Sequence, residues 1–575
     1  MRRFVLALCL CWPALGQAVP LEEVVRSGQP AAGVPGATYA DSGLAPLGVA
    51  NNNHVFFQAR LNGVDQSADT GIFVWSGGTT RLALREGQPL PEVCPDCIVG
   101  NVRVARLDDS GRVMASVDAR SGNAVVANAV LREVTSGDLR VLAFTGGPAP
   151  LREGETVTNI AEIDLAGDGT GVVSVTTTGP SRTKRIVYAL NELQFTTLAV
   201  NGEPSSAVQT LTYDSFLRVR AARGGIRILQ TRYSGGPMQG IERHGPSGAT
   251  LVASIPSPSD VLPGVEYGSW PTRSHIGVGP MGDVVYGVTG QAGSSPPMGA
   301  IYYAPHDDGP VAFAWAELDA GEFSPGFSFS SRVADFGMAH FSETGQTLFT
   351  AFLRDADGEP VPAQQLWHYD PATHARMPVA WPGAPILHSP YVPAQWPIYF
   401  SNAGIDREGN AIFGFQIYPN SGSGIAMWSR LNGRRIILDT SRPAFFPPLG
   451  ALTPIFLSLG QFAPEPTGNR PLSDDGRFAF SVSARRMGAF PPVGLTGIYT
   501  ATIPNCDFID FNLDGLTPDV QDLADFLAVF SGDLCAGQQP GDAPCNTDID
   551  FNNDGLALDN ADIEAFFTLF GGGNC

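Results

Sequence analysis

Short runs of apolar residues, each preceded by a turn rich in Asn, Asp and Gly, recur along most of the chain. The pattern is clear in NNNHVFFQARL at 51–61, DDSGRVMASV at 108–117 and SDDGRFAFSV at 473–482. Because each run is short and bounded by turn residues, it predicts a strand rather than a helix. Aligning the copies on the turn residue that needs a positive φ gives eight units, with turns at Asn53, Gly111, Gly169, Gly225, Gly282, Gly345, Gly409 and Gly476.

A Gly-x-Pro turn after a further apolar strand closes most of the units. It reads REGQP at 85–89, TGGP at 145–148, NGEP at 201–204 and PGAP at 382–385. The eighth unit lacks this closing strand, whereas EVVRSGQP at 23–30 supplies one with no unit before it. The number of closing strands equals the number of units if the N-terminal strand completes the last unit, as in a ring closed by its own two ends.

We therefore predict a mainly β protein with an eight-bladed β-propeller over residues 19–503. Units of 56 to 67 residues with several strands fit the blades of such a ring, and closure protects the strand edges that an open array exposes. The fourth unit, ARGGIRILQT at 222–231, is weak, so a seven-bladed ring is an alternative. A linear β-solenoid and two separate sandwiches are further alternatives.

The repeat resembles that of a family of exported bacterial proteins built from tandem N-x-x-G-x-x-A-F units. SDDGRFAF at 473–480 and DREGNAIF at 406–413 carry most of the likeness. The resemblance covers most of the chain and implies a propeller, but it implies no established reaction.

The N-terminus has the layout of a secretory signal peptide over residues 1–18. Arg2 and Arg3 precede the apolar run FVLALCLCWPALG, and the small residues of GQA at 16–18 suit a cleavage site before Val19. No later run of about 18 apolar residues follows, so we predict no transmembrane anchor. The expected location is outside the cytoplasm, either secreted or at the cell surface.

Charge narrows the range of partners. The chain has 56 acidic and 35 basic residues, a net charge of −21, which disfavours nucleic acid and anionic membrane surfaces. The same charge is compatible with cations, neutral polysaccharide or a protein partner.

Cysteines are expected to form disulfides, because six remain after the signal peptide and an even number in an exported chain favours pairing. They are Cys94, Cys97, Cys506, Cys535, Cys545 and Cys575. CPDC at 94–97 stands alone, so a disulfide that braces a loop is favoured over a redox or zinc pair. For the last four cysteines, the simplest connectivity pairs Cys506 with Cys535 and Cys545 with Cys575, but the sequence leaves all three connectivities open.

Two oxygen-rich loops, DFNLDG at 510–515 and DFNNDG at 550–555, lie 40 positions apart near the C-terminus. Their oxygens alternate as in a calcium loop with Gly at position 6, and ligands without His or Cys fit Ca²⁺. We predict two Ca²⁺ ions. The predicted ligands are Asp510, Asn512, Asp514 and the Leu516 carbonyl in the first loop, and Asp550, Asn552, Asp554 and the Leu556 carbonyl in the second.

An amphipathic helix is predicted after each loop, and the two helices are expected to pack face to face. The apolar stripes are Leu523, Phe526, Leu527 and Phe530, then Ile563, Phe566, Phe567 and Phe570.

Residues 504–575 resemble a dockerin domain of the Gly/Cys-rich type found in exported bacterial proteins. The matching features are the two Asp-x-Asn-x-Asp-Gly loops, the helices and the duplication. The resemblance implies an attachment module for a cohesin-like or envelope sorting protein. Dockerin loops usually close with Asp at position 12, where this chain has Gln521 and Ala561. Asp522 and Asp562 follow one residue later, so we assign them as ligands of a longer loop.

Two alternatives to that ligand set are open. In the first alternative, Asp519 and Asp559, at position 10 of the loops, supply part of the calcium coordination. In the other, the segment is an Asp-rich turn that binds no metal.

No catalytic constellation emerges from the sequence. GVGPMG at 277–282 matches G-x-G-x-x-G, but a strand follows it where a phosphate site needs a helix. The acids that recur in the repeats, such as Asp109 and Asp475, are interpreted as turn residues. We therefore predict an exported, non-catalytic binding or display protein that attaches through its C-terminal module. The alternatives are a propeller glycoside hydrolase or polysaccharide lyase borne by a dockerin, and a structural surface component.

Overall fold

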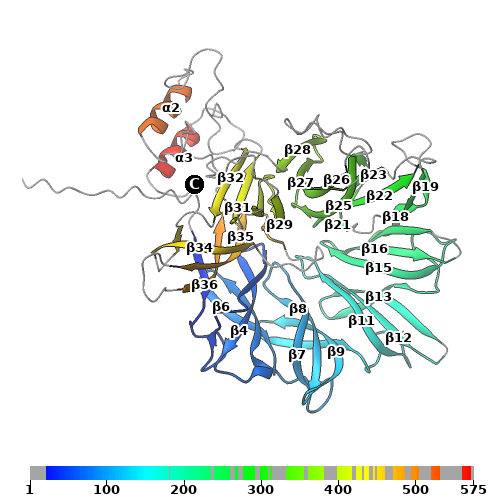
Figure 1. Cartoon of the computed structure of the whole chain (residues 1–575). Coiled ribbons are helices and arrows are strands. Elements are labelled where there is room, and N and C mark those ends of the chain that lie inside the picture. The colour runs from blue at the N-terminus through cyan, green and yellow to red at the C-terminus, as the bar shows by residue number, and fades with distance from the viewer. Residues whose placement is uncertain are drawn as a thin grey trace, which may run out of the picture.

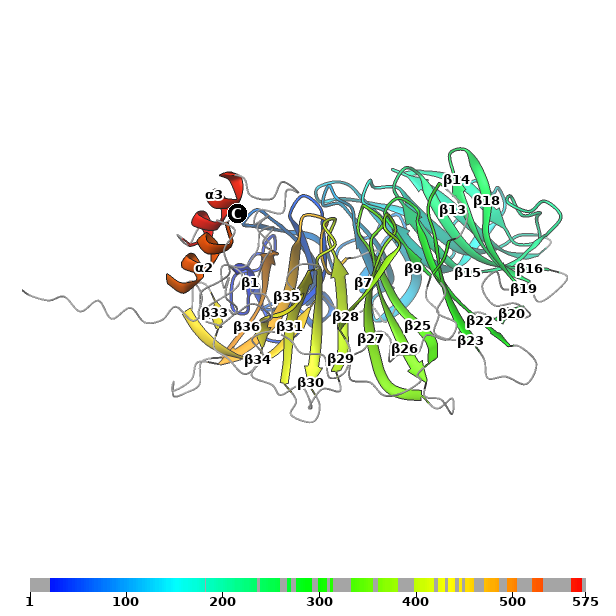
Figure 2. The ribbon, with the colours of Figure 1, turned by 90° about the horizontal axis from the view of Figure 1, so that it is seen from above.

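The computed structural model describes eighteen stretches of the chain. They are residues 21–180, 182–234, 238–258, 266–269, 276–291, 298–307, 311–313, 332–354, 360–380, 398–417, 422–429, 433–439, 444–446, 450–459, 470–485, 494–503, 520–530 and 560–570. Within them, strands form eight separate antiparallel sheets. The sheets follow one another around a common axis as the blades of a closed ring (Figure 1), which Figure 2 shows from its rim. The chain is an eight-bladed β-propeller, as predicted.

The first four blades follow one another between residues 38 and 255. Blade one contains β2 (Thr38–Tyr39), β3 (Ala45–Ala50), β4 (His54–Asn62), the 3-10 helix η1 (Gln66–Ala68), β5 (Thr70–Ser76) and β6 (Thr79–Arg85). Blade two contains β7 (Ile98–Leu107), β8 (Val113–Ser121), β9 (Ala124–Thr135) and β10 (Asp138–Phe144). Blade three contains β11 (Thr156–Leu165), β12 (Gly171–Thr178), β13 (Thr183–Asn191) and β14 (Gln194–Val200). Blade four, the weak repeat, is complete, with β15 (Tyr213–Ala222), β16 (Ile226–Tyr233), β17 (Gln239–Gly245) and β18 (Gly248–Ile255).

The other four blades complete the ring. Blade five contains β19 (Ser257–Pro258), β20 (Glu266–Ser269), β21 (Gly277–Val278), β22 (Val284–Gln291), β23 (Met298–Ala304) and β24 (Val311–Phe313). Blade six contains β25 (Arg332–Phe341), β26 (Thr347–Arg354), β27 (Pro360–Asp370) and β28 (Ala375–Ala380). Blade seven contains β29 (Ile398–Ile405), β30 (Ala411–Ile417), β31 (Gly422–Ser429) and β32 (Gly433–Asp439). Blade eight contains β33 (Ala444–Phe446), β34 (Gly450–Leu459), β35 (Arg477–Arg485) and β36 (Gly494–Thr502), together with the N-terminal β1 (Glu22–Arg26).

The N-terminal strand closes the ring, as the count of closing strands predicts. β1 pairs antiparallel with β36, with Val25 opposite Ile498. Both side chains are buried in a core cluster that also includes Phe57 and Phe73 of blade one. The pairing and the shared core join the two ends of the propeller, which excludes the solenoid and the two-sandwich alternatives.

The eight turn residues identified by the repeat share one backbone conformation. Their φ angles lie between 62° at Asn53 and 93° at Gly282, the left-handed region that glycine and asparagine tolerate best. Space around the turns restricts the residue further. A Cβ on Gly111 would lie 3.0 Å from the His54 ring of blade one, and one on Gly282 would lie 2.8 Å from Ile226 of blade four. The residue that follows the turn of one blade thus packs against the turn of the next blade. Glycine is favoured at the turn position both by its positive φ and by the limited space there.

Blade four departs from the repeat at a buried position of its core. Glu242 of β17 lies opposite Leu229, where blade one has Phe73 opposite Phe57. Its carboxylate is fully buried and accepts hydrogen bonds from Ser205 Oγ (2.5 Å), Tyr213 Oη (2.6 Å) and Tyr233 Oη (2.7 Å), with His244 Nε2 at 2.8 Å. Burial alone would raise the pKa of Glu242, but these partners outweigh it and lower the pKa. The buried charge is therefore accommodated by hydrogen bonds from β15, from β16, from the segment before β15 and from His244 on β17 itself.

Two helices lie beyond the propeller in the sequence and outside the ring in both views (Figures 1 and 2). They are α2 (Val520–Phe530) and α3 (Asn560–Phe570). Phe526 and Phe566 are buried and stack with ring centroids 3.9 Å apart, so the helices pack face to face as predicted. The stripes are only partly buried, because Leu527 and Phe567 are 44% and 46% exposed. No helix in the described ranges is long and apolar enough to span a membrane.

Replacing Val25 with Asp should destabilise the whole propeller. Val25 is 1% exposed, and an unpaired carboxylate there would lower the free energy of unfolding by more than about 3 kcal/mol. Glu22→Gln on the same strand is the matched control, because it removes only a partly exposed ion pair with Arg477 and should cost less than about 1 kcal/mol. Calorimetric unfolding of the full chain measures both. Equal thermal stability of V25D and wild type would contradict ring closure by β1.

Candidate functional site

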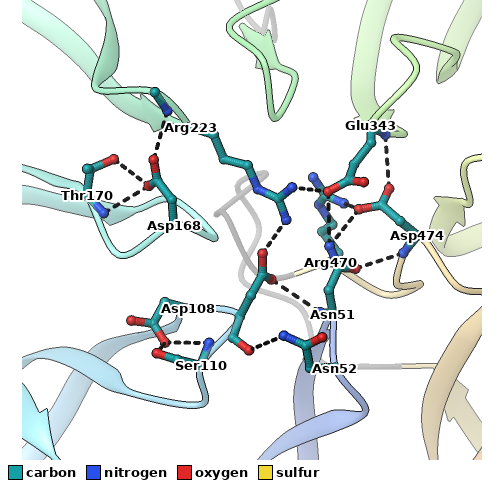
Figure 3. Close-up of polar contacts among 12 residues, drawn as sticks. Asn51, Asn52, Asp108, Ser110, Asp168, Thr170, Arg223, Glu343, Arg470 and Asp474 are labelled. Carbon is teal, nitrogen blue, oxygen red and sulfur yellow. Dashed lines mark hydrogen bonds and ion pairs between the residues drawn. The ribbon is translucent and has the colours of Figure 1, made fainter.

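One position of the repeat, two residues before the turn residue, brings polar side chains to the centre of the ring. Blades one, two, four, six and eight supply Asn51, Asp109, Arg223, Glu343 and Asp474, and Arg470 joins them from the segment before the eighth turn. Figure 3 shows Asn51, Arg223, Glu343, Arg470 and Asp474 converging from different blades. We call these six residues the axial cluster.

Arg223 links blades on different sides of the axis. Its guanidinium forms ion pairs with Asp109 of blade two and Glu343 of blade six. Burial lowers the pKa of Arg223, but the two carboxylates outweigh burial and the net pKa is raised. The guanidinium therefore stays protonated at any pH at which the protein is folded.

Asn51 and Arg470 complete the cluster around Asp474. Asn51 Nδ2 donates to Asp474 Oδ2 at 2.9 Å and to Glu343 Oε1 at 3.2 Å, and its Oδ1 accepts from the Asp474 amide at 3.0 Å. Arg470 Nη1 donates to Asp474 Oδ2 at 2.5 Å, and the Glu343 amide donates to Asp474 Oδ1 at 3.0 Å. Each carboxylate of the cluster thus has a guanidinium partner. The arrangement suits a clamp between blades better than a general acid or base, which needs a carboxyl group directed at a substrate.

Blade three contributes a glycine at the same repeat position. A Cβ on Gly167 would overlap the Asp109 carboxylate and lie 3.0 Å from Arg223 Nε. The Asp109 amide also donates to the Gly167 carbonyl at 2.8 Å. Gly167 therefore leaves the space through which the pair between Asp109 and Arg223 passes.

Acidic residues three positions before the turn residue, and so one position before the axial-cluster position, stabilise the turns themselves. Asp108 and Asp406 are fully buried at equivalent places of blades two and seven, but the pKa values of the two move in opposite directions. Burial would raise the pKa of Asp108, but Ser110, the Arg112 amide and Arg132 together lower it. Asp406 accepts from the Asn410 amide at 2.8 Å and from Asn410 Nδ2 at 3.1 Å, but these contacts do not offset burial and then the Glu408 charge, which raise its pKa to about 7.

These contacts divide the recurring acids into two kinds. Asp475 accepts from Ser473 within its own turn, as the interpretation of these acids as turn residues requires. Asp109, interpreted in the same way, instead reaches across the axis to Arg223. The signal for this is the position itself, which varies among Asn, Asp, Arg and Glu and so does not follow the needs of a turn.

Most of the predicted metal-site and disulfide residues lie outside the described residues. They are Asp510, Asn512, Asp514, Leu516, Asp550, Asn552, Asp554 and Leu556, with Cys506, Cys535, Cys545 and Cys575. Asp522 is in α2, and Asp562 is fully buried in the first turn of α3. Cys94 and Cys97 form the predicted disulfide, with an S–S distance of 2.02 Å. Within the part of the chain that the structure covers, no three His, Cys, Asp or Glu side chains gather into a metal site.

Comparison with known proteins adds little to the site. A family of unknown function, DUF7453, matches residues 12–186, which include β1, the first two blades and part of the third. No curated protein sequence matches the chain.

The solved structures similar to the chain include propeller domains and enzymes. An oligogalacturonate lyase in complex with manganese is 8% identical, with a TM-score of 0.36 over 84% of this chain and 98% of that one. The β-propeller domain of the Trilobed protease from Pyrococcus furiosus is 9% identical, with a TM-score of 0.34 over 69% and 97%. A periplasmic gluconolactonase from Pseudomonas aeruginosa is 13% identical, with a TM-score of 0.30 over 68% and 93%. These values bring no reaction or substrate to this chain, and the architecture rests on its own strand pairing.

Replacing Arg223 with Met should destabilise the ring, because Asp109 and Glu343 lose their shared cation while the side-chain volume is kept. The three side chains are 22% to 31% exposed, so we expect a loss of about 1–3 kcal/mol rather than the cost of a fully buried pair. Arg140→Met is the control, since its pair with Asp138 is exposed and should contribute less than about 1 kcal/mol. Denaturant unfolding measures both variants. Equal losses of unfolding free energy would mean that the ion pairs of the axial cluster stabilise the ring no more than an exposed surface pair does.

Asp406→Asn and Asp108→Asn should have opposite pH dependences. The pKa of Asp406 is raised from 3.8 to about 7, so the folded state holds its proton more tightly and loses stability as pH rises from 4 to 7. Asn cannot ionise, so the Asp406 variant should gain on the order of a few kcal/mol over wild type at pH 8. The pKa of Asp108 is lowered, so its variant should lose about 2–3 kcal/mol at pH 7 and approach wild type below pH 3.8.

Unfolding free energies measured across this pH range test both expectations. Parallel pH profiles for the two variants would contradict the assignment of different environments to the same repeat position.

Proposed function

We propose that the chain is an exported, non-catalytic binding or display protein. In this proposal the propeller over residues 19–503 carries the binding surface, and residues 504–575 form a calcium-dependent attachment module of the dockerin type. The observation that carries the proposal is the stacking of Phe526 on Phe566.

The stacked residues occupy equivalent places in the duplicated segment. Phe566 follows Phe526 by the same 40 positions that separate DFNLDG at 510–515 from DFNNDG at 550–555. Contact between equivalent residues is expected when two copies of a loop–helix unit pair around a local two-fold axis. The contact therefore supports a single module built from both copies, rather than two unrelated acidic turns.

Calcium explains how so small a module would fold. Two helices of 11 residues each bury little apolar surface, and modules of this size usually need metals or disulfides. Asp562, the last ligand proposed for the second loop, is fully buried in the first turn of α3. A buried carboxylate there is consistent with an acidic loop that folds around a cation.

The outer face of the helix pair supports an attachment role. Leu527 and Phe567 are also 40 positions apart, and both remain exposed beside the buried Phe526 and Phe566. A duplicated apolar surface of this kind suits a protein partner, which we propose to be cohesin-like or an envelope sorting protein.

The axial cluster supports a binding role for the propeller over a catalytic one. Asp109, Glu343 and Asp474 are all engaged by Arg223 or Arg470, so within the described residues the ring centre offers no pair of carboxyl groups directed at a substrate.

Calcium titration of the full mature chain tests the attachment module. Isothermal titration calorimetry should show two sites, one lost in the Asp510→Ala, Asp514→Ala double variant and the other in the Asp550→Ala, Asp554→Ala double variant. Asp138→Ala is the control, because this partly exposed acid belongs to the propeller edge and should leave both sites unchanged. Absence of calcium binding by the wild type would overturn the proposal.

The non-catalytic role needs a separate measurement. Incubation of the same protein with a panel of neutral and acidic polysaccharides should release no new reducing ends and no unsaturated products. Turnover of any of them would favour the glycoside hydrolase or lyase alternative.

A further inference from the structure

A cavity of about 100 Å³ lies at the ring axis, beside the axial cluster. It is surrounded by the ends of β11, β15, β21, β25 and β29 and by residues 470–472, so six of the eight blades contribute to its wall. Much of the lining is small, with Gly167, Ala221, Gly279 and Gly404 among its residues. A polar cavity of this size has room for several water molecules or for one small ligand.

The charge of the lining is opposite to that of the chain as a whole. Arg220, Arg223 and Arg470 line the cavity, against the single carboxylate of Asp164. Acidic residues outnumber basic ones 56 to 35 over the full sequence, so a lining with more arginine than acid is an exception. The carboxylates that pair with these arginines, Glu162, Asp109, Glu343 and Asp474, are not among the lining residues, so an anion inside the cavity would meet guanidinium groups rather than those acids.

The arginines retain hydrogen-bond donors after their known partners are counted. A guanidinium has five N–H groups. Arg223 uses its two terminal nitrogens for Asp109 and Glu343, and Arg470 uses one for Asp474. Among the described residues, the remaining N–H groups of Arg223 and Arg470 form no hydrogen bond, and both residues line the cavity. A ligand with several acceptor oxygens matches these remaining donors.

His340 is a further lining residue of the cavity. Burial, and then the charge of Arg470, lower the pKa of His340 to about 4. The imidazole is therefore neutral at physiological pH, and it leaves the arginines as the cations of the cavity.

We propose that the axial cavity binds a small oxyanion, a carboxylate or a tetrahedral oxyanion, between Arg223 and Arg470. The ligand accepts from the guanidinium N–H groups that the axial cluster leaves over, while Asp109, Glu343 and Asp474 hold both arginines in place. The inference names the ligand class of the propeller and so rests on the proposed binding role, but it does not depend on the calcium module.

Anion binding by the calcium-loaded full chain tests the inference. Sodium acetate and sodium sulfate are titrated at constant ionic strength, with chloride as the reference anion, and binding is followed by calorimetry and by the thermal unfolding temperature. At least one of the two should bind saturably and raise the unfolding temperature above that in chloride. Binding of acetate alone identifies a carboxylate site, and binding of sulfate alone identifies a site for tetrahedral oxyanions.

Conservative variants locate the site. Arg223→Lys and Arg470→Lys keep the positive charge toward the axial carboxylates but lose the planar fork of donors, so each should weaken anion binding about tenfold. Ala221→Leu adds bulk to the cavity wall without changing a charge and should reduce binding even if a lysine variant fails to fold. Arg140→Lys, far from the axis on the edge strand β10, is the control and should bind as the wild type does.

Two results would overturn the inference: neither oxyanion binds better than chloride, or the Arg223, Arg470 and Ala221 variants all bind as tightly as wild type. A calcium titration of the same sample keeps the two proposals apart. Calcium binding without oxyanion binding contradicts this inference alone, whereas oxyanion binding without calcium binding contradicts the attachment module alone.

Discussion

The pairing of β1 with β36 is the interaction on which the rest of the ring depends. Each blade covers the apolar face of the next, so an open array would leave one face and one strand edge uncovered at each end. The N-terminal strand removes both ends at once, because its Val25 enters the core that Ile498 shares with Phe57 and Phe73 of blade one. Arg477 adds a polar link across the same junction through Asn53 Oδ1 at 2.8 Å. Closure in turn brings the turns of distant blades close enough to interact at the axis.

The axial cluster uses that proximity to connect blades that are not neighbours. Arg223 joins blades two and six, and Asn51 joins blades six and eight to blade one. Partly buried ion pairs add little net stability, since desolvation offsets much of their attraction. Their stronger effect is on geometry, because a shifted blade would leave a carboxylate or a guanidinium without its partner. The cluster therefore favours one arrangement of the blades, and it holds the arginines that line the axial cavity.

The repeat and the closed ring could be predicted from the sequence because their signals are local. A turn that needs positive φ selects Gly or Asn at every copy, and the spare closing strand at 23–30 is visible without any structure. The axial cluster could not be predicted in this way, since its contacts join residues up to 423 positions apart, as between Asn51 and Asp474. Glu242 was equally hidden, because its partners come from three strands and a loop of the folded blade. In the C-terminal helices the periodicity indicated the apolar stripe, but a single helix partner buries Phe526 and Phe566 and leaves Leu527 and Phe567 exposed.

Native-state hydrogen exchange of the full chain tests the central claim, closure of one cooperative ring, most directly. If β1 completes blade eight, amides of residues 22–26 and 494–502 exchange only when the whole propeller unfolds, with the same opening free energy as the central strands of blade three. Amides of β1 that exchange far faster, while blade three stays protected, would contradict closure and describe an open array with a loosely attached N-terminal strand.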